Sequence, residues 1–101
     1  MVLKLRLDVQ AWADFSAIRE HLMAEASAVS ANRVRDHLRK RMESLRHNPR
    51  LGVRTSDPDI RILPPTRYPY RIYYTITDEA IVILHIRHSA RRDPDIADFS
   101  N

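Results

Sequence analysis

The sequence predicts a single α+β domain, in which a strand and two antiparallel helices precede a three-stranded antiparallel meander that packs on the helices. Three observations predict this class. Two amphipathic helical patterns fill the first half, and two apolar strands flank a tight turn near the end. Most of the prolines and the only glycine lie between the helical patterns and these strands. Strands this apolar need cover on at least one face, and the helices supply it. Residues 1–101 are therefore assigned to one domain.

Residues 2–7 predict the first strand, because three leucines alternate with a valine and two basic residues. Asp8 follows at a position where its carboxylate can cap a helix. We expect this helix to run to about Ala26 and to bury one apolar stripe made of Val9, Trp12, Phe15, Ile18 and Leu22. Because Trp12 would then be a core residue, Trp12→Ala is expected to cost about 3 to 5 kcal/mol by opening a cavity.

A second helix is predicted after an interruption at residues 27–31, with Ser30 as its cap. It is expected to end near His47 and Asn48, since Pro49 disfavours helical backbone in the residue before it. Its apolar stripe consists of Ala31, Val34, Leu38, Met42 and Leu45. Its polar side is basic, through Arg33, Arg35, Arg39, Lys40 and Arg46. A basic side of this kind is either simply solvated or a landing site for an acidic partner.

The chain between the helices and the long strands is predicted to be mostly irregular. Residues 48–59 carry no periodic pattern, and Gly52 stands where a turn with positive φ is expected. Ile60–Leu63 predicts a short strand, and Pro64 and Pro65 end it. A strand bounded by prolines is typical of a position at or near a sheet edge.

Two long strands are predicted at residues 70–77 and 81–88, joined by a short hairpin turn. Alternation along the first of these strands places four residues on the core face: Tyr70, Ile72, Tyr74 and Ile76. Tyr73 lies on the other face, and its ring is expected to be the freer one. The second strand is expected to be central because both of its faces are apolar: Val82, Leu84 and Ile86 on one, Ile81 and Ile83 on the other. The acidic tail at 93–101 predicts a helical turn that docks on the body.

Composition restricts the partners without selecting one. Seventeen Lys and Arg against thirteen Asp and Glu give a net charge of +4, which favours an anionic partner, either nucleic acid or an acidic protein. Cysteine is absent, which excludes disulfides and thiolate chemistry. The N-terminal residues alternate apolar and charged side chains, which is unlike a secretory signal, and no run of about 20 apolar residues predicts a membrane span. We therefore expect a cytoplasmic protein with no membrane partner.

Three motifs, in order, resemble those of the ParE branch of the RelE/ParE superfamily of bacterial type II toxin–antitoxin toxins. They are Leu45 through Asn48-Pro49 to Gly52, the run YRIYY at 70–74, and the run ILHIRH at 83–88 leading into Arg91. The resemblance extends over the whole chain. It implies a compact α+β fold, a ParD-like antitoxin that neutralises the toxin in a possible heterotetramer, DNA gyrase as the inhibited target, and a role in plasmid stabilisation. It implies no bond-making chemistry and no cofactor.

Seven residues near the ends of the long strands are the candidates for contacting the antitoxin or the target: Arg71, Tyr73, His85, Arg87, His88, Arg91 and Arg92. The alternative is that they are structural, with the arginines paired to surface acids and His88 merely ending the last strand. Deleting the segment after His88 is expected to abolish toxicity and to leave the fold largely intact. The four tyrosines at 68–74 are similarly open to two interpretations, base stacking or core packing, and alternation favours the core.

A messenger RNase of the ribosome-dependent RelE type is the alternative function. That reaction needs a base, an acid and cations around the phosphate, which His88, Arg91 and Arg92 would have to supply. Many such relatives carry a tyrosine near the C-terminus, whereas every tyrosine of this chain stands at or before position 74. A basic binding module with no toxic role is the third hypothesis.

A metal site is not predicted, because His85 and His88 lie three apart on a strand and face opposite sides.

Overall fold

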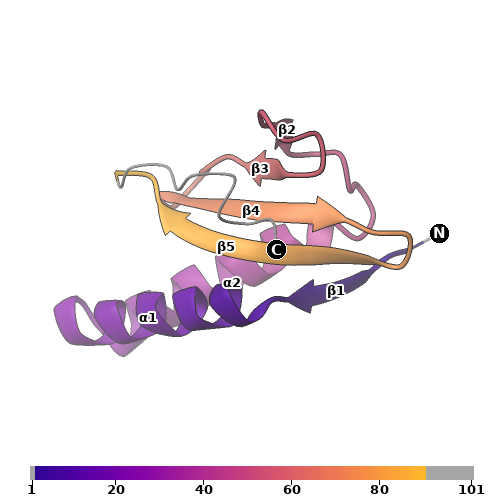
Figure 1. Ribbon diagram of the computed structural model, residues 1–101. Helices are drawn as coiled ribbons and strands as arrows, with labels where there is room; N and C mark the ends of the chain where they lie inside the picture. Colours follow the sequence, from indigo (N-terminus) through magenta and orange to yellow (C-terminus); the bar gives the residue numbers. More distant parts are fainter. Residues whose placement is uncertain (1, 91–101) are drawn as a thin grey trace.

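The computed structural model describes residues 2–90, which form a five-stranded sheet with two helices packed against one face (Figure 1). The predicted α+β class and element order are confirmed. The elements are β1 (Lys4–Leu7), α1 (Val9–Glu25), α2 (Ala28–Ser44), β2 (Val53–Arg54), β3 (Arg61–Leu63), β4 (Tyr70–Ile76) and β5 (Ala80–His88). The tail predicted to form a helical turn, with Arg91 and Arg92, lies outside the described residues.

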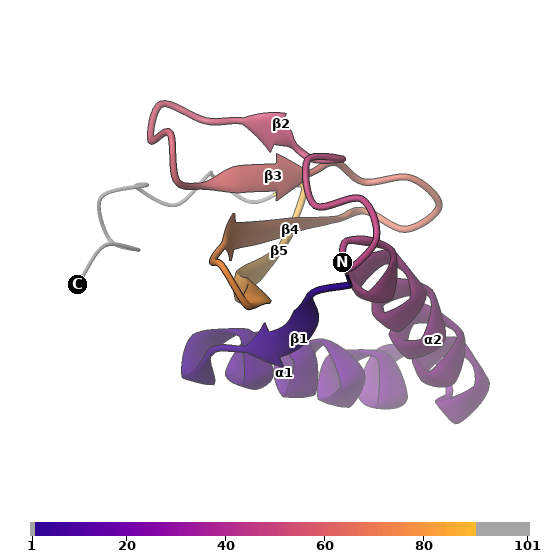
Figure 2. The ribbon, with the colours of Figure 1, turned by 90° about the vertical axis from the view of Figure 1, so that its right-hand side faces the viewer.

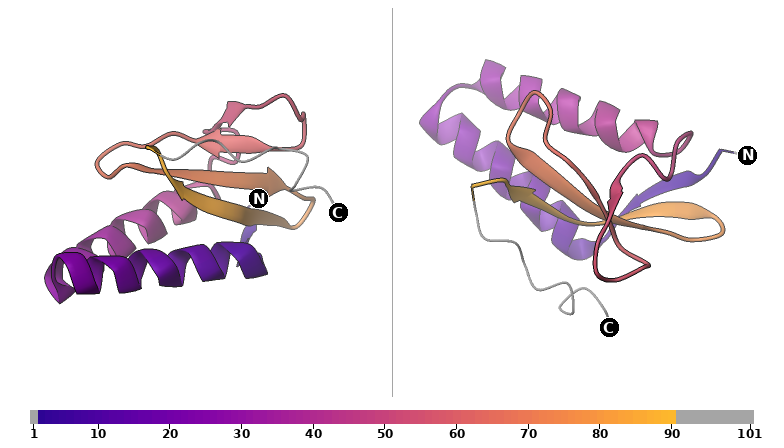
Figure 3. Two further views of the ribbon diagram at one scale, coloured as in Figure 1. Left: turned by 60° about the vertical axis from the view of Figure 1, so that its left-hand side comes forward. Right: turned by 90° about the horizontal axis from the view of Figure 1, so that it is seen from above.

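The strand order is β1-β5-β4-β3-β2, with β1 parallel to β5 and every other pair antiparallel. The long strand β5 therefore has partners on both sides, as its apolar faces predict. Figure 2 shows β2 and β3 at the edge of the sheet far from α1, and Figure 3 shows the antiparallel helical hairpin beneath the sheet. The short strand at 61–63 is next to the edge strand β2, which forms within the segment predicted to be irregular.

Helix α1 begins at the predicted cap, where the Asp8 carboxylate accepts a hydrogen bond from the Val9 N–H at 3.1 Å. Its predicted stripe is wrong at the first two positions, because Val9 is 82% exposed and Trp12 is 57% exposed. The stripe that meets the core instead consists of Ala11, Phe15, Ile18 and Leu22. These residues follow a continuous 4-3-4 spacing, and the small Ala11 lets the helix approach the sheet closely.

Helix α2 begins three residues earlier than predicted, because the cap is Ser27 rather than Ser30. Ser27 has an extended backbone, and its hydroxyl accepts a bond from the Ser30 N–H at 3.0 Å, so Ser30 already lies within the first turn. The helix ends at Ser44, earlier than predicted, as the hydrogen bonds tighten to the three-residue pattern. The predicted apolar stripe is confirmed, and all five of its residues are buried.

Gly52 is required by a close approach and not by a left-handed backbone, which corrects the expectation of a positive φ. A Cβ atom at this position would lie 2.7 Å from the Tyr74 hydroxyl oxygen and 2.8 Å from the Ile62 carbonyl oxygen. The Tyr74 hydroxyl accepts a hydrogen bond from the Gly52 N–H at 2.8 Å and donates one to the Pro49 carbonyl at 2.7 Å. One buried phenol thus fastens the 49–52 loop to the sheet.

A β-bulge on β5 changes which side chains face the helices. Tyr73 pairs with His85, but the next residue, Tyr74, pairs with Ile83, so Leu84 is an extra residue. As a result Ile81, Ile83 and Ile86 all belong to the core beneath the helices. The predicted grouping of Ile86 with Val82 is therefore wrong, because the strict two-residue period does not continue through a bulge.

Candidate binding surfaces

Four of the seven candidate residues lie in two cross-strand pairs of β4 and β5, with the pair Ile72–Ile86 between them. Arg71 is opposite Arg87, and Tyr73 is opposite His85. The β4 residues that flank Arg71 belong to the core beneath the helices, so the arginine pair is on the other face of the sheet. We call the pair Arg71 and Arg87 the outer-face arginines. Two guanidinium groups opposite one another concentrate positive charge at this end of the sheet.

The backbone near the end of β5 positions the first of these arginines. Arg71 donates a hydrogen bond from Nη2 to the Ser89 carbonyl oxygen at 3.1 Å, and the Pro69 carbonyl accepts from the Ser89 N–H at 2.7 Å. The chain just after β5 is therefore fastened to the start of β4. Both arginine side chains are partly exposed, which suits contact with an anionic surface.

Tyr73 is fully buried, at 0% exposure, so the expectation that it is the freer ring is wrong. It lies on the middle strand of a three-strand stretch, with Ile62 of β3 on one side and His85 of β5 on the other. Two further buried residues, Ile60 and Val82, lie outside the core beneath the helices. The burial of Tyr73 is therefore not confined to the face beneath the helices.

His85 is paired with a residue that sequence reasoning missed. Its Nδ1 contacts the Asp14 carboxylate of α1, and the same carboxylate oxygen accepts the Ile86 N–H at 2.9 Å. The two side chains are only 12% and 14% exposed. Strand β1 is shorter than β5, so the Ile86 N–H has no strand partner on that side, and Asp14 supplies the acceptor.

His88 is on the other side of the sheet from the outer-face arginines. It pairs with Tyr70, whose ring lies edge-on to the imidazole with the centroids 5.4 Å apart, and its Nδ1 accepts the Ala90 N–H at 3.0 Å. Burial raises the pKa of Tyr70 above its ordinary value, so this phenol stays protonated. Within residues 2–90, no three His, Cys, Asp or Glu side chains gather as a metal site would require.

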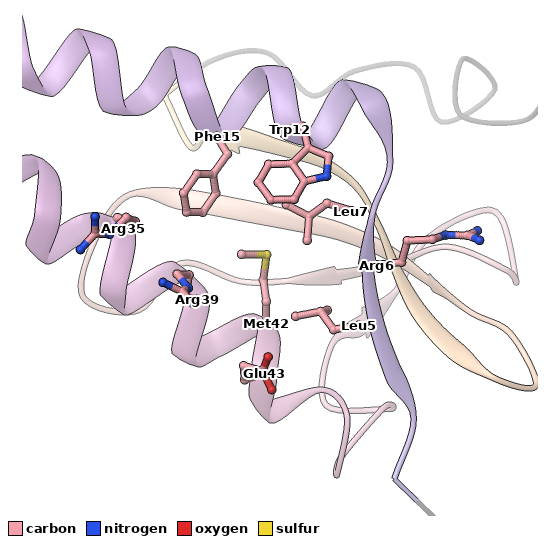
Figure 4. A pocket seen from close by; sticks show the side chains of 9 residues that line it. All are labelled: Leu5, Arg6, Leu7, Trp12, Phe15, Arg35, Arg39, Met42 and Glu43. Carbon is pink, nitrogen blue, oxygen red and sulfur yellow. The ribbon is translucent and has the colours of Figure 1, made fainter.

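A groove on the helix side of the molecule explains the exposure of Trp12. It has a volume of about 640 Å³ and lies where β1, α1 and α2 meet. Figure 4 shows Trp12 and Phe15 of α1 facing Met42 of α2, with Leu5 and Leu7 of β1 alongside. We call this the apolar groove. Its rim carries cations and one acid: Arg6, Arg35, Arg39 and Glu43.

The comparison with protein families identifies the kind of protein. The model of the family described as "ParE toxin of type II toxin-antitoxin system, parDE" matches residues 5–93. The chain belongs to the ParE toxin family. Membership is consistent with the order of the motifs at 45–52, 70–74 and 83–91, and it confirms the resemblance drawn from them. No curated protein matches this ParE-family chain significantly.

Solved structures share the fold of this ParE-family chain at low sequence identity. A chain of the chromosomal ParDE TA system from P. aeruginosa is 22% identical and superimposes with a TM-score of 0.77, covering 86% of this chain and 96% of its own length. A mutant of E. coli toxin RelE in the free state is 17% identical, with a TM-score of 0.66 and coverages of 89% and 86%. The same mutant with an antitoxin RelBc peptide is 18% identical, with a TM-score of 0.64 and coverages of 91% and 87%.

The two histidines of β5 lie in different surroundings. His85 is largely buried and bound to Asp14, and His88 lies on the opposite side of the sheet from the outer-face arginines. An acid and a base that act on one phosphodiester have to converge on it, which these two histidines do not do.

Neither helix of the described residues is long and apolar enough to cross a membrane.

Proposed function

We propose that this protein is the toxin of a type II toxin–antitoxin system, that it binds and inhibits DNA gyrase without catalysing a reaction, and that a ParD-like antitoxin neutralises it. The observation that carries the proposal is the match of the ParE toxin model to residues 5–93. The proposed place of action is the cytoplasm, and the proposed neutralised form is a toxin–antitoxin heterotetramer.

The apolar groove supports an antitoxin partner. Trp12 is a large apolar side chain at the surface, and such groups mark binding sites when they line a concave, otherwise apolar surface. Strand β1 is an edge strand: the N–H groups of Lys4 and Asp8 point to β5, so those of Leu5 and Leu7 point to the open side. An antitoxin segment with apolar residues for the groove and acids for Arg35 and Arg39 fits this surface.

The outer-face arginines support a second, separate contact. They lie on the face of the sheet opposite the helices, whereas the apolar groove is on the helix side. We assign the outer-face arginines to the target, together with Arg91 and Arg92 of the sequence, which lie outside the described residues. A guanidinium group binds carboxylate or phosphate through two parallel hydrogen bonds, and both groups are present on an enzyme that holds DNA.

The experiment that tests the function compares two targets in parallel. Purified protein is added to a gyrase supercoiling reaction and to a translating ribosome extract in which cut messenger is measured. We expect supercoiling to stop and the messenger to stay intact. Intact supercoiling together with messenger cleavage would establish the RelE-type reaction instead, and no effect in either assay would favour a binding module without toxicity.

A further inference from the structure

A second cleft, at the edge of the sheet, has a different character from the apolar groove. It has a volume of about 770 Å³ and lies between the 47–51 loop, β2 and β3. Its cations come from three separate segments: Arg50 from the loop, Arg54 from β2 and Arg61 from β3, with His47 beside them. No Asp or Glu is among the residues that line it. We call it the cationic cleft.

The cationic cleft is held in place by hydrogen bonds between the loop and the sheet. Arg61 donates from Nη1 to the Gly52 carbonyl at 2.8 Å and to the Arg50 carbonyl at 3.4 Å. The Tyr74 hydroxyl bridges the same loop to the sheet. The wall is therefore fixed before any ligand arrives, and binding to a fixed wall loses less conformational entropy than ordering a flexible loop.

Arg50 and Arg54 are fully available to a ligand, and Arg61 keeps Nε and Nη2 for one, because both of its carbonyl bonds come from Nη1. Arg50 and Arg54 are exposed, and among residues 2–90 neither forms an ion pair. The acids nearest in the sequence, Asp57 and Asp59, are not among the residues that line the cleft, and within residues 2–90 neither forms an ion pair. Three arginines in one cleft repel one another when no acid neutralises them, which is unfavourable for the free protein. The same arrangement favours the binding of an anion.

We propose that the cationic cleft binds the phosphate backbone of double-stranded DNA. Phosphate groups recur along a duplex, and arginines from separate segments can each contact one. Leu51 and Ile76, which also line the cleft, supply apolar contact for the sugar carbons. An acidic peptide would gain little by strand addition here, since β2 is only two residues long. The choice of DNA rests on the proposed function, because a toxin bound to gyrase lies next to DNA.

The test measures DNA binding by the full chain without gyrase, so that its outcome is independent of the proposed target. A fluorescent duplex is titrated with protein at several salt concentrations, and the anisotropy gives the affinity. Three phosphate contacts predict that log K falls with log salt at a slope of about −2.7. In the double variant Arg50→Ala, Arg54→Ala, we expect binding to weaken by about tenfold and the slope to fall to about −0.9.

The matched control is the double variant Arg19→Ala, Arg33→Ala, which removes two exposed charges from the helices. We expect it to bind DNA as the wild type does, and thermal melting confirms that both variants fold. Equal loss in the control would attribute binding to net charge and overturn the proposal. Three other results would also overturn the proposal. They are the absence of duplex binding at low salt, tighter binding of an RNA duplex than of DNA, and tighter binding of polyglutamate than of DNA that is lost in the cleft variant.

Discussion

Ala11 and Trp12 are neighbours in the sequence, yet Ala11 is fully buried and Trp12 is more than half exposed. Consecutive residues on a helix point about 100° apart, so one of the two has to leave the core when the other enters it. The apolar pattern of α1 contains both registers, and it is the fit of the helix against the sheet that selects Ala11. The indole then becomes a wall of the apolar groove.

Trp12→Ala is accordingly expected to cost stability of about 1 kcal/mol, well below the 3 to 5 kcal/mol expected of a core residue. The variant should lose antitoxin affinity by at least about 30-fold, because a tryptophan in a concave interface is a typical hot spot. Urea unfolding and antitoxin titration measure the two quantities. Met23→Ala, on the same helix and also exposed, is the control. A large loss of stability with unchanged antitoxin affinity would contradict the assignment of Trp12 to the groove.

His37 is a second residue whose surroundings have a measurable consequence. Burial, and then the charges of Arg41, Arg67 and Lys40, lower the pKa of His37 below its ordinary value. Its ring lies edge-on to Tyr68 at 5.1 Å, and Arg41 of the same helix donates to the Pro64 carbonyl. The neutral imidazole thus belongs to the packing that holds the 64–68 loop on α2.

The folded protein binds the His37 proton less readily than the unfolded chain does, so protonation favours unfolding. This contribution to stability is complete above the unfolded pKa of about 6.5 and is lost as the pH falls through the lower folded value. Between pH 7.5 and pH 5.5 we expect the midpoint of thermal unfolding to fall less in the variant His37→Gln than in the wild type. Identical pH profiles would show that His37 is not titrating with the fold.

At the scale of the elements, Asp14 links α1 to the part of β5 that extends beyond β1. The carboxylate accepts the Ile86 N–H, 72 residues away in the sequence, and contacts His85. The apolar stripe of α1 and this one polar contact together dock the helix on the strand. A strand edge that is covered in this way is also protected from pairing with another chain.

Asp14→Ala is expected to destabilise the fold by about 1 to 3 kcal/mol, because it leaves the Ile86 N–H without an acceptor. Hydrogen exchange of the Ile86 amide should accelerate more than hydrogen exchange of the amides in β3. The β3 amides serve as the reference because Asp14 does not contact that strand. Asp36→Ala, the loss of an exposed carboxylate on α2, provides the comparison and should change stability by less than about 0.5 kcal/mol. Equal effects of the two substitutions would exclude a special role for Asp14.

Local pattern predicted every element of this fold except β2, and their order, since helical and strand periods and the Asp8 cap depend only on neighbouring residues. It failed where distant residues decide. The bulge at Leu84 shifts the face of Ile86, the Tyr74 hydroxyl explains Gly52, and Tyr73 is buried although it lies outside the core beneath the helices. The outer-face arginines were predicted because they are cations in a recognisable strand motif. Asp14 and the apolar groove carry no motif in the sequence.

At the scale of the whole molecule, the three surfaces lie on different parts of the fold. The apolar groove is on the helix side (Figure 4), the outer-face arginines are on the opposite face of the sheet, and the cationic cleft is at the β2 edge. An antitoxin that occupies the groove does not by itself cover the arginines. Substitutions on the two faces should therefore affect antitoxin binding and target inhibition separately.

Inhibition of gyrase supercoiling by a variant of the outer-face arginines is the most direct test of this account. The double variant Arg71→Gln, Arg87→Gln is compared with the wild type and with Arg19→Gln, Arg33→Gln, which removes the same charge from the helices; thermal melting verifies that each is folded. We predict that the wild type and the helix variant stop supercoiling and that the sheet variant is at least about tenfold weaker, a loss of about 1.4 kcal/mol. Full inhibition by the folded sheet variant, or none by the wild type, would contradict the account.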